Sequence, residues 1–294
     1  LTLSVDAVYS RSRNLVRLRD LNAPAPFTPN AAALTPANIA LLQAAPDNAA
    51  RAALAQTLGL VRSQAAADAS RPVGLVAGGA RQITVSETAG KSEYMALILQ
   101  AVKERGSDDY GFRLSYTLSR LRNDTDDINF RAANANDFST EYGPSANDRR
   151  HVISAVGYLY PLDGLTLTAA GLFQSGQPVN LVPDARIFGT QDLNGDGASF
   201  GENFVGNSDR FPGATRNSAR LPWSATVDIG IRYLLLKRIE LSADVFNLFN
   251  ANNQSGFANA ATTSNQVQFG GGAPFVQRNA GPPRQFQFGI AYKF

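Results

Sequence analysis

Apolar and polar residues alternate at every second position in many segments of the chain. Residues 219–235 show the pattern clearly, because Leu221, Trp223, Ala225, Val227, Ile229, Ile231 and Tyr233 alternate with Ser224, Thr226, Asp228, Gly230 and Arg232. Successive side chains of a β-strand point to opposite faces, so this period predicts a strand with one apolar and one polar face. The pattern recurs at residues 1–9, 110–119, 165–174, 239–245 and 286–294, and residues 94–105 and 150–160 predict strands with a less decided face.

The connections between these roughly eight predicted strands fall into two length classes. Tight turns are predicted at 106–109, 161–164 and 236–238, and long loops rich in Asn, Asp, Gly, Ala and Pro at about 20–92, 123–147, 177–218 and 250–283. Short and long connections alternate, which is typical of a barrel whose short turns face the periplasm and whose long loops face the outside. The sequence therefore predicts an all-β, antiparallel transmembrane β-barrel with long extracellular loops.

The first long loop, at about 20–92, also carries helix signals. Thr35 followed by Pro36 is typical of an N-cap and first helical position, and an Ala- and Leu-rich run follows Pro46 and Asp47. We expect short helices packed on this extracellular loop.

Composition narrows the class of protein further. Mean hydropathy is −0.16, and no apolar run approaches the roughly 20 residues of a transmembrane helix. A membrane barrel remains compatible with this value, because only every second residue of its strands is apolar. The 27 Lys and Arg residues are scattered, so nucleic acid is not an expected partner. The sequence lacks an initiator Met and a signal-peptide pattern, as expected of a fragment of a longer precursor.

Two aromatic residues are spaced as expected for the two edges of a membrane. Trp223 and Tyr233 share a face of one predicted strand. At about 3.3 Å per residue and a tilt of about 40°, they lie roughly 25 Å apart along the membrane normal, which is the height of the apolar band of a barrel. We predict that they belong to the membrane girdles.

Five sequence motifs follow one another along the chain: EYGPSANDRRH (141–151), DLNGDG (192–197), RNSAR (216–220), SADVFNLFNANN (242–253) and PRQFQFGIAYKF (283–294). In this order they resemble the C-terminal barrel of TonB-dependent outer-membrane receptors, most closely the Oar-like subgroup with an N-terminal carboxypeptidase-regulatory-like domain. The resemblance implies a barrel of about 22 strands. Residues 1–294 would be its C-terminal part, and the plug domain is absent from this chain.

The resemblance also implies a function and partners. The protein would be a receptor in the outer membrane of a Gram-negative bacterium, performing energised uptake of an unidentified ligand captured by the extracellular loops, without chemistry on that ligand. Its partners would be outer-membrane lipid, the barrel-assembly machinery and, through the absent plug, the TonB energy-coupling complex. Phe288, Ile290, Tyr292 and Phe294 resemble the terminal signal that the assembly machinery reads; the alternative is the ordinary last strand of a soluble barrel.

Two other functions stay open at this point. The chain could be a complete eight-stranded outer-membrane barrel that serves as an adhesin or a structural anchor. A barrel-borne hydrolase would need a cluster of His with Asp or Ser at the rim, but His151 is the only histidine and has no such neighbours in sequence. We expect His151 at a strand end near the outer rim.

The remaining candidate residues are acidic or lumen-facing. Asp192, Asn194 and Asp196 precede Gly197 in the manner of a calcium loop, but the twelfth position is Asn203 rather than Glu, so a calcium site and a solvated Asx-turn cluster are both open. The acids in the segment RNDTDD, namely Asp124, Asp126 and Asp127, are expected at a solvated loop tip. The inward charges would solvate the lumen, contact a plug or line a substrate route: Asp6, Arg113, Asp228, Arg232, Glu240 and Asp244.

Overall fold

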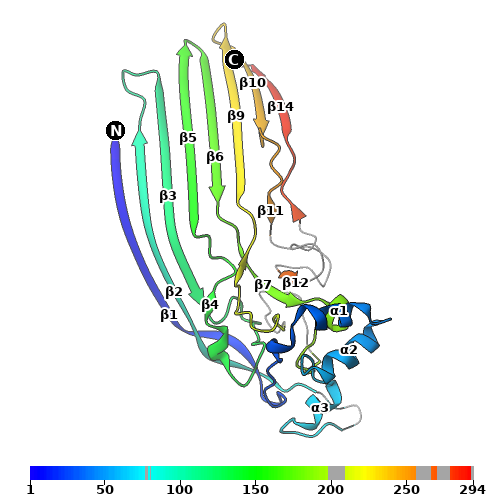
Figure 1. Cartoon of the computed structure of the whole chain (residues 1–294). Coiled ribbons are helices and arrows are strands. Elements are labelled where there is room, and N and C mark those ends of the chain that lie inside the picture. The colour runs from blue at the N-terminus through cyan, green and yellow to red at the C-terminus, as the bar shows by residue number, and fades with distance from the viewer. Residues whose placement is uncertain (77–78, 80, 198–208, 256–265, 270–278, 293–294) are drawn as a thin grey trace.

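The computed structural model contains one curved antiparallel sheet of eight long strands (Figure 1). The structure describes residues 1–76, 79, 81–197, 209–255, 266–269 and 279–292. In sheet order the strands are β1 (Thr2–Asp20), β2 (Thr84–Lys103), β3 (Tyr110–Asn123), β5 (His151–Leu162), β6 (Leu165–Gln174), β9 (Ser224–Leu235), β10 (Ile239–Phe246) and β14 (Gln285–Tyr292). The two-residue strand β4 (Gly143–Pro144) also pairs with β3. The predicted all-β antiparallel fold is confirmed, with β1 and β14 at the two edges of the sheet.

One face of the sheet exposes large apolar side chains. Leu97 is 40% exposed, Leu118 is 38% exposed and Phe288 is 78% exposed. Side chains directly opposite each other on antiparallel strands share a face, and the pairing of Leu97 with Leu118 continues the apolar face across β2 and β3. The opposite face is polar and includes the ion pair of Arg232 with Asp244 at 3.2 Å. This division is the one that a transmembrane barrel requires.

The structure corrects two of the predicted boundaries. β2 begins at Thr84, so the first long connection covers residues 21–83 rather than about 20–92. Residues 84–92 are strand because they pair with the C-terminal half of β1 although their composition is polar. β9 begins only at Ser224. Leu221, which the alternation placed on the apolar outer face, is 4% exposed and packs against Val179.

The tight turns have the backbone conformations that short hairpins need. Leu236 and Lys237, between β9 and β10, have φ values of 50° and 58°, and two consecutive positive φ angles match the right-handed twist of the flanking strands. Gly164, between β5 and β6, has φ of 80°, and a Cβ atom there would lie 2.9 Å from the carbonyl oxygen of Leu234. Glycine is therefore required at this turn.

The long connections form a folded layer at the end of the sheet opposite the short turns (Figure 1). We call residues 21–83, 124–150, 175–197 and 209–223 the loop layer. Its helices are α1 (Pro36–Ala44), α2 (Asn48–Thr57), α3 (Gln64–Ala69) and α4 (Ala185–Phe188), with the 3-10 turns η1 (Ala31–Ala33) and η2 (Phe138–Glu141). The short strands are β7 (Pro178–Pro183), β8 (Ala219–Arg220), β11 (Gln254–Ser255), β12 (Gln266–Phe269) and β13 (Asn279–Ala280), of which β11, β12 and β13 lie outside the loop layer.

The two predicted helices begin where the sequence indicates, α1 after the predicted N-cap Thr35 and α2 after Asp47. The side chain of Thr35 accepts a hydrogen bond from the backbone N–H of Asn38 at 3.2 Å, and that of Asp47 accepts one from Ala50 at 2.8 Å. Each bond satisfies a backbone donor that the first helical turn leaves unpaired. None of the helices in the described part of the chain combines the length and apolar composition that crossing a membrane requires.

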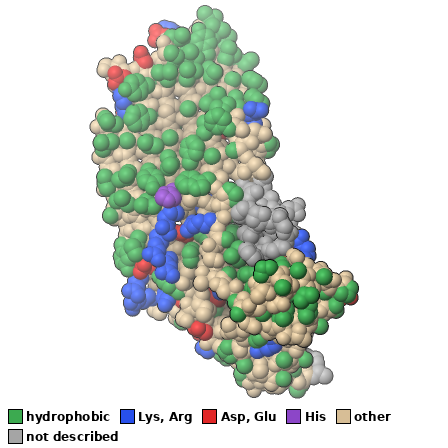
Figure 2. Space-filling view, in the orientation of Figure 1, with side chains coloured by type: hydrophobic (Ala, Val, Ile, Leu, Met, Phe, Trp, Pro, Cys, Tyr) green, Lys and Arg blue, Asp and Glu red, His purple; other side chains and the backbone are tan. Residues whose placement is uncertain are grey.

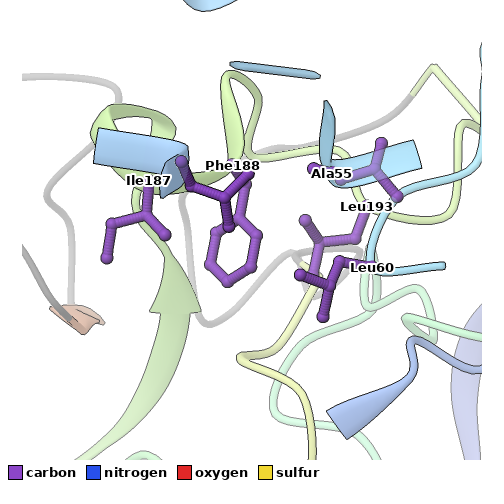
Figure 3. Packing of buried hydrophobic residues seen from close by; sticks show 7 residues of the cluster. Ala55, Leu60, Ile187, Phe188 and Leu193 are labelled. Atoms are coloured by element: carbon purple, nitrogen blue, oxygen red, sulfur yellow. The ribbon is translucent and has the colours of Figure 1, made fainter. Parts of the chain in front are cut away.

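A small hydrophobic core holds the loop layer together. Side chains from the first and third long connections converge there, and Figure 3 shows how they meet. The buried members are Leu42, Ala55, Leu60, Val61, Ile187, Phe188 and Leu193. Because the members from the two connections lie more than 120 positions apart in the sequence, the core fixes two loops to each other rather than stabilising either alone.

Candidate functional site

A cavity of about 290 Å³ lies in the loop layer and is the candidate ligand site. Its walls come from residues 23–29 of the first long connection, 131–136 of the second and 209–214 of the third. Proline, alanine and the rings of Phe27 and Phe211 supply most of the apolar lining. The cavity therefore depends on three connections holding one another in place.

Three arginine side chains add positive charge to the cavity lining. Arg62 is fixed by bonds from Nε to the carbonyl oxygen of Asn194 at 2.6 Å and from Nη1 to that of Ala25 at 2.7 Å. Arg131 donates to the Gln82 side chain at 3.4 Å. Arg210 forms an ion pair with Glu141, and its buried Nε–H has no hydrogen-bond partner among the described residues.

A buried carboxyl group closes one side of this cavity. Asp209 accepts hydrogen bonds from the backbone N–H of Leu193 and, at 3.0 Å, from that of Asn194. Burial, with a further contribution from the negative charge of Asp196, raises the pKa of Asp209 to about 8. The carboxyl is therefore largely neutral at pH 7, whereas Arg62 keeps its charge although burial lowers its pKa.

We expect Asp209 to make the loop layer less stable as pH rises. In the unfolded chain its carboxyl loses its proton near the ordinary aspartate pKa of 3.8, whereas the folded state holds the proton until about pH 8. The stabilisation is therefore complete below about pH 4 and is lost as pH rises through about 8. Urea midpoints for tryptic cleavage of the loop layer should fall between pH 5 and pH 8.5, and Asp209→Asn should remove most of that slope.

The exposed residue Asp137 provides the control for this measurement. Hydrogen bonds from Ser139 lower the pKa of its carboxyl, so Asp137 titrates below the tested range. Asp137→Asn should leave the pH slope unchanged. A slope of wild-type size in Asp209→Asn would show that another group is responsible.

A buried arginine joins two of the long connections beside the cavity. Arg216 is 1% exposed; its Nη1 donates to the carbonyl oxygens of Asn123 at 2.6 Å and Glu141 at 2.8 Å, and its Nη2 forms an ion pair with Asp126. The guanidinium also lies 4.8 Å from the centroid of the Phe130 ring. Residues of the motifs at 141–151 and 216–220 are thus brought together by one side chain.

Of the three acids expected at a solvated loop tip, Asp127 is exposed as expected, whereas Asp124 and Asp126 are buried in ion pairs. Asp124 is 3% exposed and pairs with Arg17 at 3.0 Å, while Arg17 also bonds Glu87 at 2.7 Å. The side chain of Asp126 is fully buried against Arg216. For Asp124 and Asp126 the expectation is wrong because their partners lie about 107 and 90 positions away, where local sequence gives no signal. Buried carboxylates require such partners.

The described residues do not form an assembled calcium site. The Asp192 carboxylate accepts the backbone N–H groups of Gly195 at 2.7 Å and Gly197 at 2.9 Å, and the Asn194 side chain accepts that of Asp196 at 2.7 Å. These oxygens are committed to Asx-type bonds, and no group of three or more His, Cys, Asp or Glu side chains in the described part of the chain could hold a metal. Residue 203 lies outside the described residues, so calcium binding stays a prediction.

His151 lies in an aromatic row on the outer face. It is the first residue of β5, near the rim that carries the long loops. Its ring stacks between Tyr116 and Trp223, with centroid distances of 6.1 and 5.7 Å, and its Nδ1 lies 2.9 Å from the Tyr116 hydroxyl. Trp223 is exposed immediately before β9, and Tyr233 is 37% exposed near its far end. Their role as girdle residues stays a prediction.

The predicted assembly signal lies mostly on β14. Phe288, Ile290 and Tyr292 are 78%, 80% and 52% exposed on that edge strand. Phe294 lies outside the described residues. The recognition of these residues by the assembly machinery stays a prediction.

Comparison with solved structures finds outer-membrane receptors and transporters. The ferripyoverdine receptor of Pseudomonas aeruginosa is 13% identical over 71% of this chain and 20% of its own, with a TM-score of 0.43. The ferric-catecholate import receptor Fiu of Escherichia coli is 12% identical over 71% and 22%, with a TM-score of 0.42. The transporter YddB of Escherichia coli is 9% identical over 99% and 30%, with a TM-score of 0.49.

The chain spans only 20% to 30% of the length of these receptors and transporters. No curated protein matches it. A family model described as "Outer membrane beta barrel domain" matches residues 1–287. Because this match covers nearly the whole sequence, the chain belongs to the outer membrane beta barrel domain family and is located in the outer membrane of a Gram-negative bacterium.

Proposed function

We propose that this chain is part of a TonB-dependent receptor that takes up a ligand captured by the loop layer. The cavity between the three long connections is the observation that carries the proposal, because it combines an apolar lining with three arginine side chains and lies at the loop-bearing end of the barrel. The order of the five sequence motifs supports the same interpretation. Energy for uptake would come from the coupling complex through a plug, and the ligand would be released unchanged.

Ferric chelates are the class of ligand to test first. Two of the similar solved proteins are described as receptors for ferripyoverdine and for ferric catecholates. The lining of Arg62, Arg131 and Arg210 suits a ligand that presents several oxygen acceptors. We therefore propose ferric chelates as the ligand class of this chain.

Filling the cavity tests this function. In the full-length protein, Thr28→Trp introduces a large side chain at the exposed wall of the cavity. We expect uptake of the recognised ferric chelate by intact cells, and its protection of the loops from trypsin, to fall at least tenfold. Thr57→Trp, at an exposed position of α2 that does not line the cavity, is the matched control and should have no effect.

The outcomes separate the proposal from its alternative. Equal losses in both variants, or protection that survives Thr28→Trp, would contradict ligand capture in this cavity. The adhesin or anchor function would be favoured if cells with the protein take up no chelate and cells without it lose surface adhesion.

A further inference from the structure

Cationic side chains gather on the outer face of the sheet, at its border with the loop layer. Figure 2 shows Lys and Arg side chains clustered beside the single histidine, below a surface rich in hydrophobic side chains. The strand register identifies the cations that share this face. We call them the rim cluster: Arg11, Arg13, Lys91, Arg120 and Arg122.

Cross-strand pairing places the rim cluster on the lipid-facing side. Leu97, Leu118 and His151 form one row of directly opposite residues across β2, β3 and β5. Two residues further along the strands toward the long loops, the row is Tyr9, Met95 and Arg120. Because alternate residues share a face, these rows lie on the same surface.

The rows beyond them are almost entirely charged. The next row is Arg11, Glu93 and Arg122, and the last pairs Arg13 with Lys91. The outer face therefore changes from apolar to aromatic to cationic within about 20 Å, at about 3.3 Å per residue. That order follows the change from hydrocarbon through the interface to headgroups in a membrane.

The positive charge of the rim cluster is not neutralised by the protein. Five cations face one carboxylate, Glu93, and none of the five forms an ion pair with a carboxylate in the described part of the chain. By contrast, Arg17, Arg216 and Arg220 of the loop layer and its adjoining strand are all paired. The cluster thus leaves its charge available to a partner outside the protein.

Part of the rim cluster is held in place. The Nζ of Lys91 lies 4.8 Å and the Cζ of Arg122 lies 4.6 Å from the centroid of the Tyr142 ring. Arg122 also donates to the carbonyl oxygen of Tyr142 at 3.1 Å. Orienting these two cations before binding reduces the side-chain entropy lost when an anion binds.

We propose that the rim cluster binds the phosphate groups of lipids in the outward leaflet of the membrane. The cluster adjoins the aromatic row of Tyr116, His151 and Trp223, and aromatic belts sit at the level of the headgroups. Arg and Lys side chains at this level attract lipid phosphates, and Arg offers bidentate hydrogen bonds to them. Lipid tails cover the apolar rows beside the rim cluster. The headgroups of the same lipids therefore reach these cations without competing for that surface.

Lipid titration of the full-length protein in detergent tests the proposal, with lipid A as the probe. The variant carries Arg11→Gln, Arg13→Gln and Arg120→Gln, three exposed cations outside the Tyr142 contacts. Each cation near an anionic surface contributes about fivefold in affinity, so we expect binding about 100-fold weaker. The charge-preserving triple Arg→Lys variant at the same positions should retain most of the affinity.

A matched variant controls for overall charge. It carries Arg105→Gln, Arg113→Gln and Arg186→Gln, three exposed cations outside the rim cluster, and should bind lipid A as the wild type does. Heat-modifiable mobility on gels verifies that each variant is folded.

Monophosphoryl lipid A should bind more weakly than lipid A, and inorganic phosphate at the same concentration should not displace the lipid. Unchanged affinity in the rim variant, equal losses in the control, or displacement by inorganic phosphate would overturn the proposal.

Discussion

Replacing Arg216 by Met should destabilise the loop layer by about 3 to 5 kcal/mol, the largest effect we expect from a single polar side chain. The substitution removes the cation but leaves the side chains of Asp126 and Glu141, both fully buried, in place. Removing one partner of a buried ion pair leaves an uncompensated charge in a medium of low dielectric constant. The carbonyl oxygens of Asn123 and Glu141 also lose their donor.

The midpoint of tryptic cleavage within the loop layer, followed in urea, measures this effect. Arg113→Met is the control, because Arg113 also pairs with a carboxylate, that of Glu104, but both side chains are exposed, at 70% and 80%. Exposed pairs contribute about 0 to 1 kcal/mol, so the control should change little. Adding Asp126→Asn to Arg216→Met should restore part of the loss. If the two Met variants are equally stable, the buried network does not hold the loops.

Replacing Phe188 by Ala should separate the first and third long connections. Phe188 is fully buried, packs edge-on against Phe211 at a centroid distance of 5.9 Å and lies at the centre of the hydrophobic core of the loop layer. Truncating a buried Phe to Ala costs about 3 to 5 kcal/mol, because the transfer free energy is lost and a cavity remains. Trypsin should then cleave at Arg51 and Arg62, which lie in or beside the helices that this core holds.

Leu41→Ala is the control for the Phe188 experiment. Leu41 lies on α1 but is 58% exposed, so its truncation should change the stability of the loop layer by less than about 0.5 kcal/mol. Cleavage at Arg51 that stays as slow in Phe188→Ala as in the wild type would show that α1 and α2 are stable without the third connection.

The sheet could be predicted from the sequence because its signal is local. Alternation along a strand reports which face each side chain takes, and the six segments with that period, together with the two of less decided face, contribute strands to one sheet. The caps at Thr35 and Asp47 are equally local, since each side chain bonds a backbone group three residues away. The strand boundaries were less predictable: Pro222 lacks a backbone N–H for a ladder, and β9 begins only after it.

The cavity and its surroundings could not be predicted, because they depend on contacts between distant residues. In the sequence, Arg216 is one of many scattered basic residues, yet its side chain donates hydrogen bonds to residues 75 and 93 positions away. The cavity arginines likewise come from separate connections. The rim cluster does have a local signal: continuing the period of β1 from Tyr9 gives Arg11 and Arg13 on the outer face.

The central claim is that the apolar face of the sheet contacts lipid while the opposite face contacts water, and a pair of adjacent residues on β3 tests it most directly. Leu114 is 41% exposed on the apolar face, and Ser115, the next residue, lies on the polar face. Nitroxide labels on Leu114→Cys and Ser115→Cys, in the full-length protein in bilayers, report contact with lipid-soluble oxygen and with a water-soluble nickel complex. The account predicts that oxygen relaxes the label at 114 and nickel the label at 115. Equal shielding of both labels from oxygen, as in a close-packed protein interior, would contradict it.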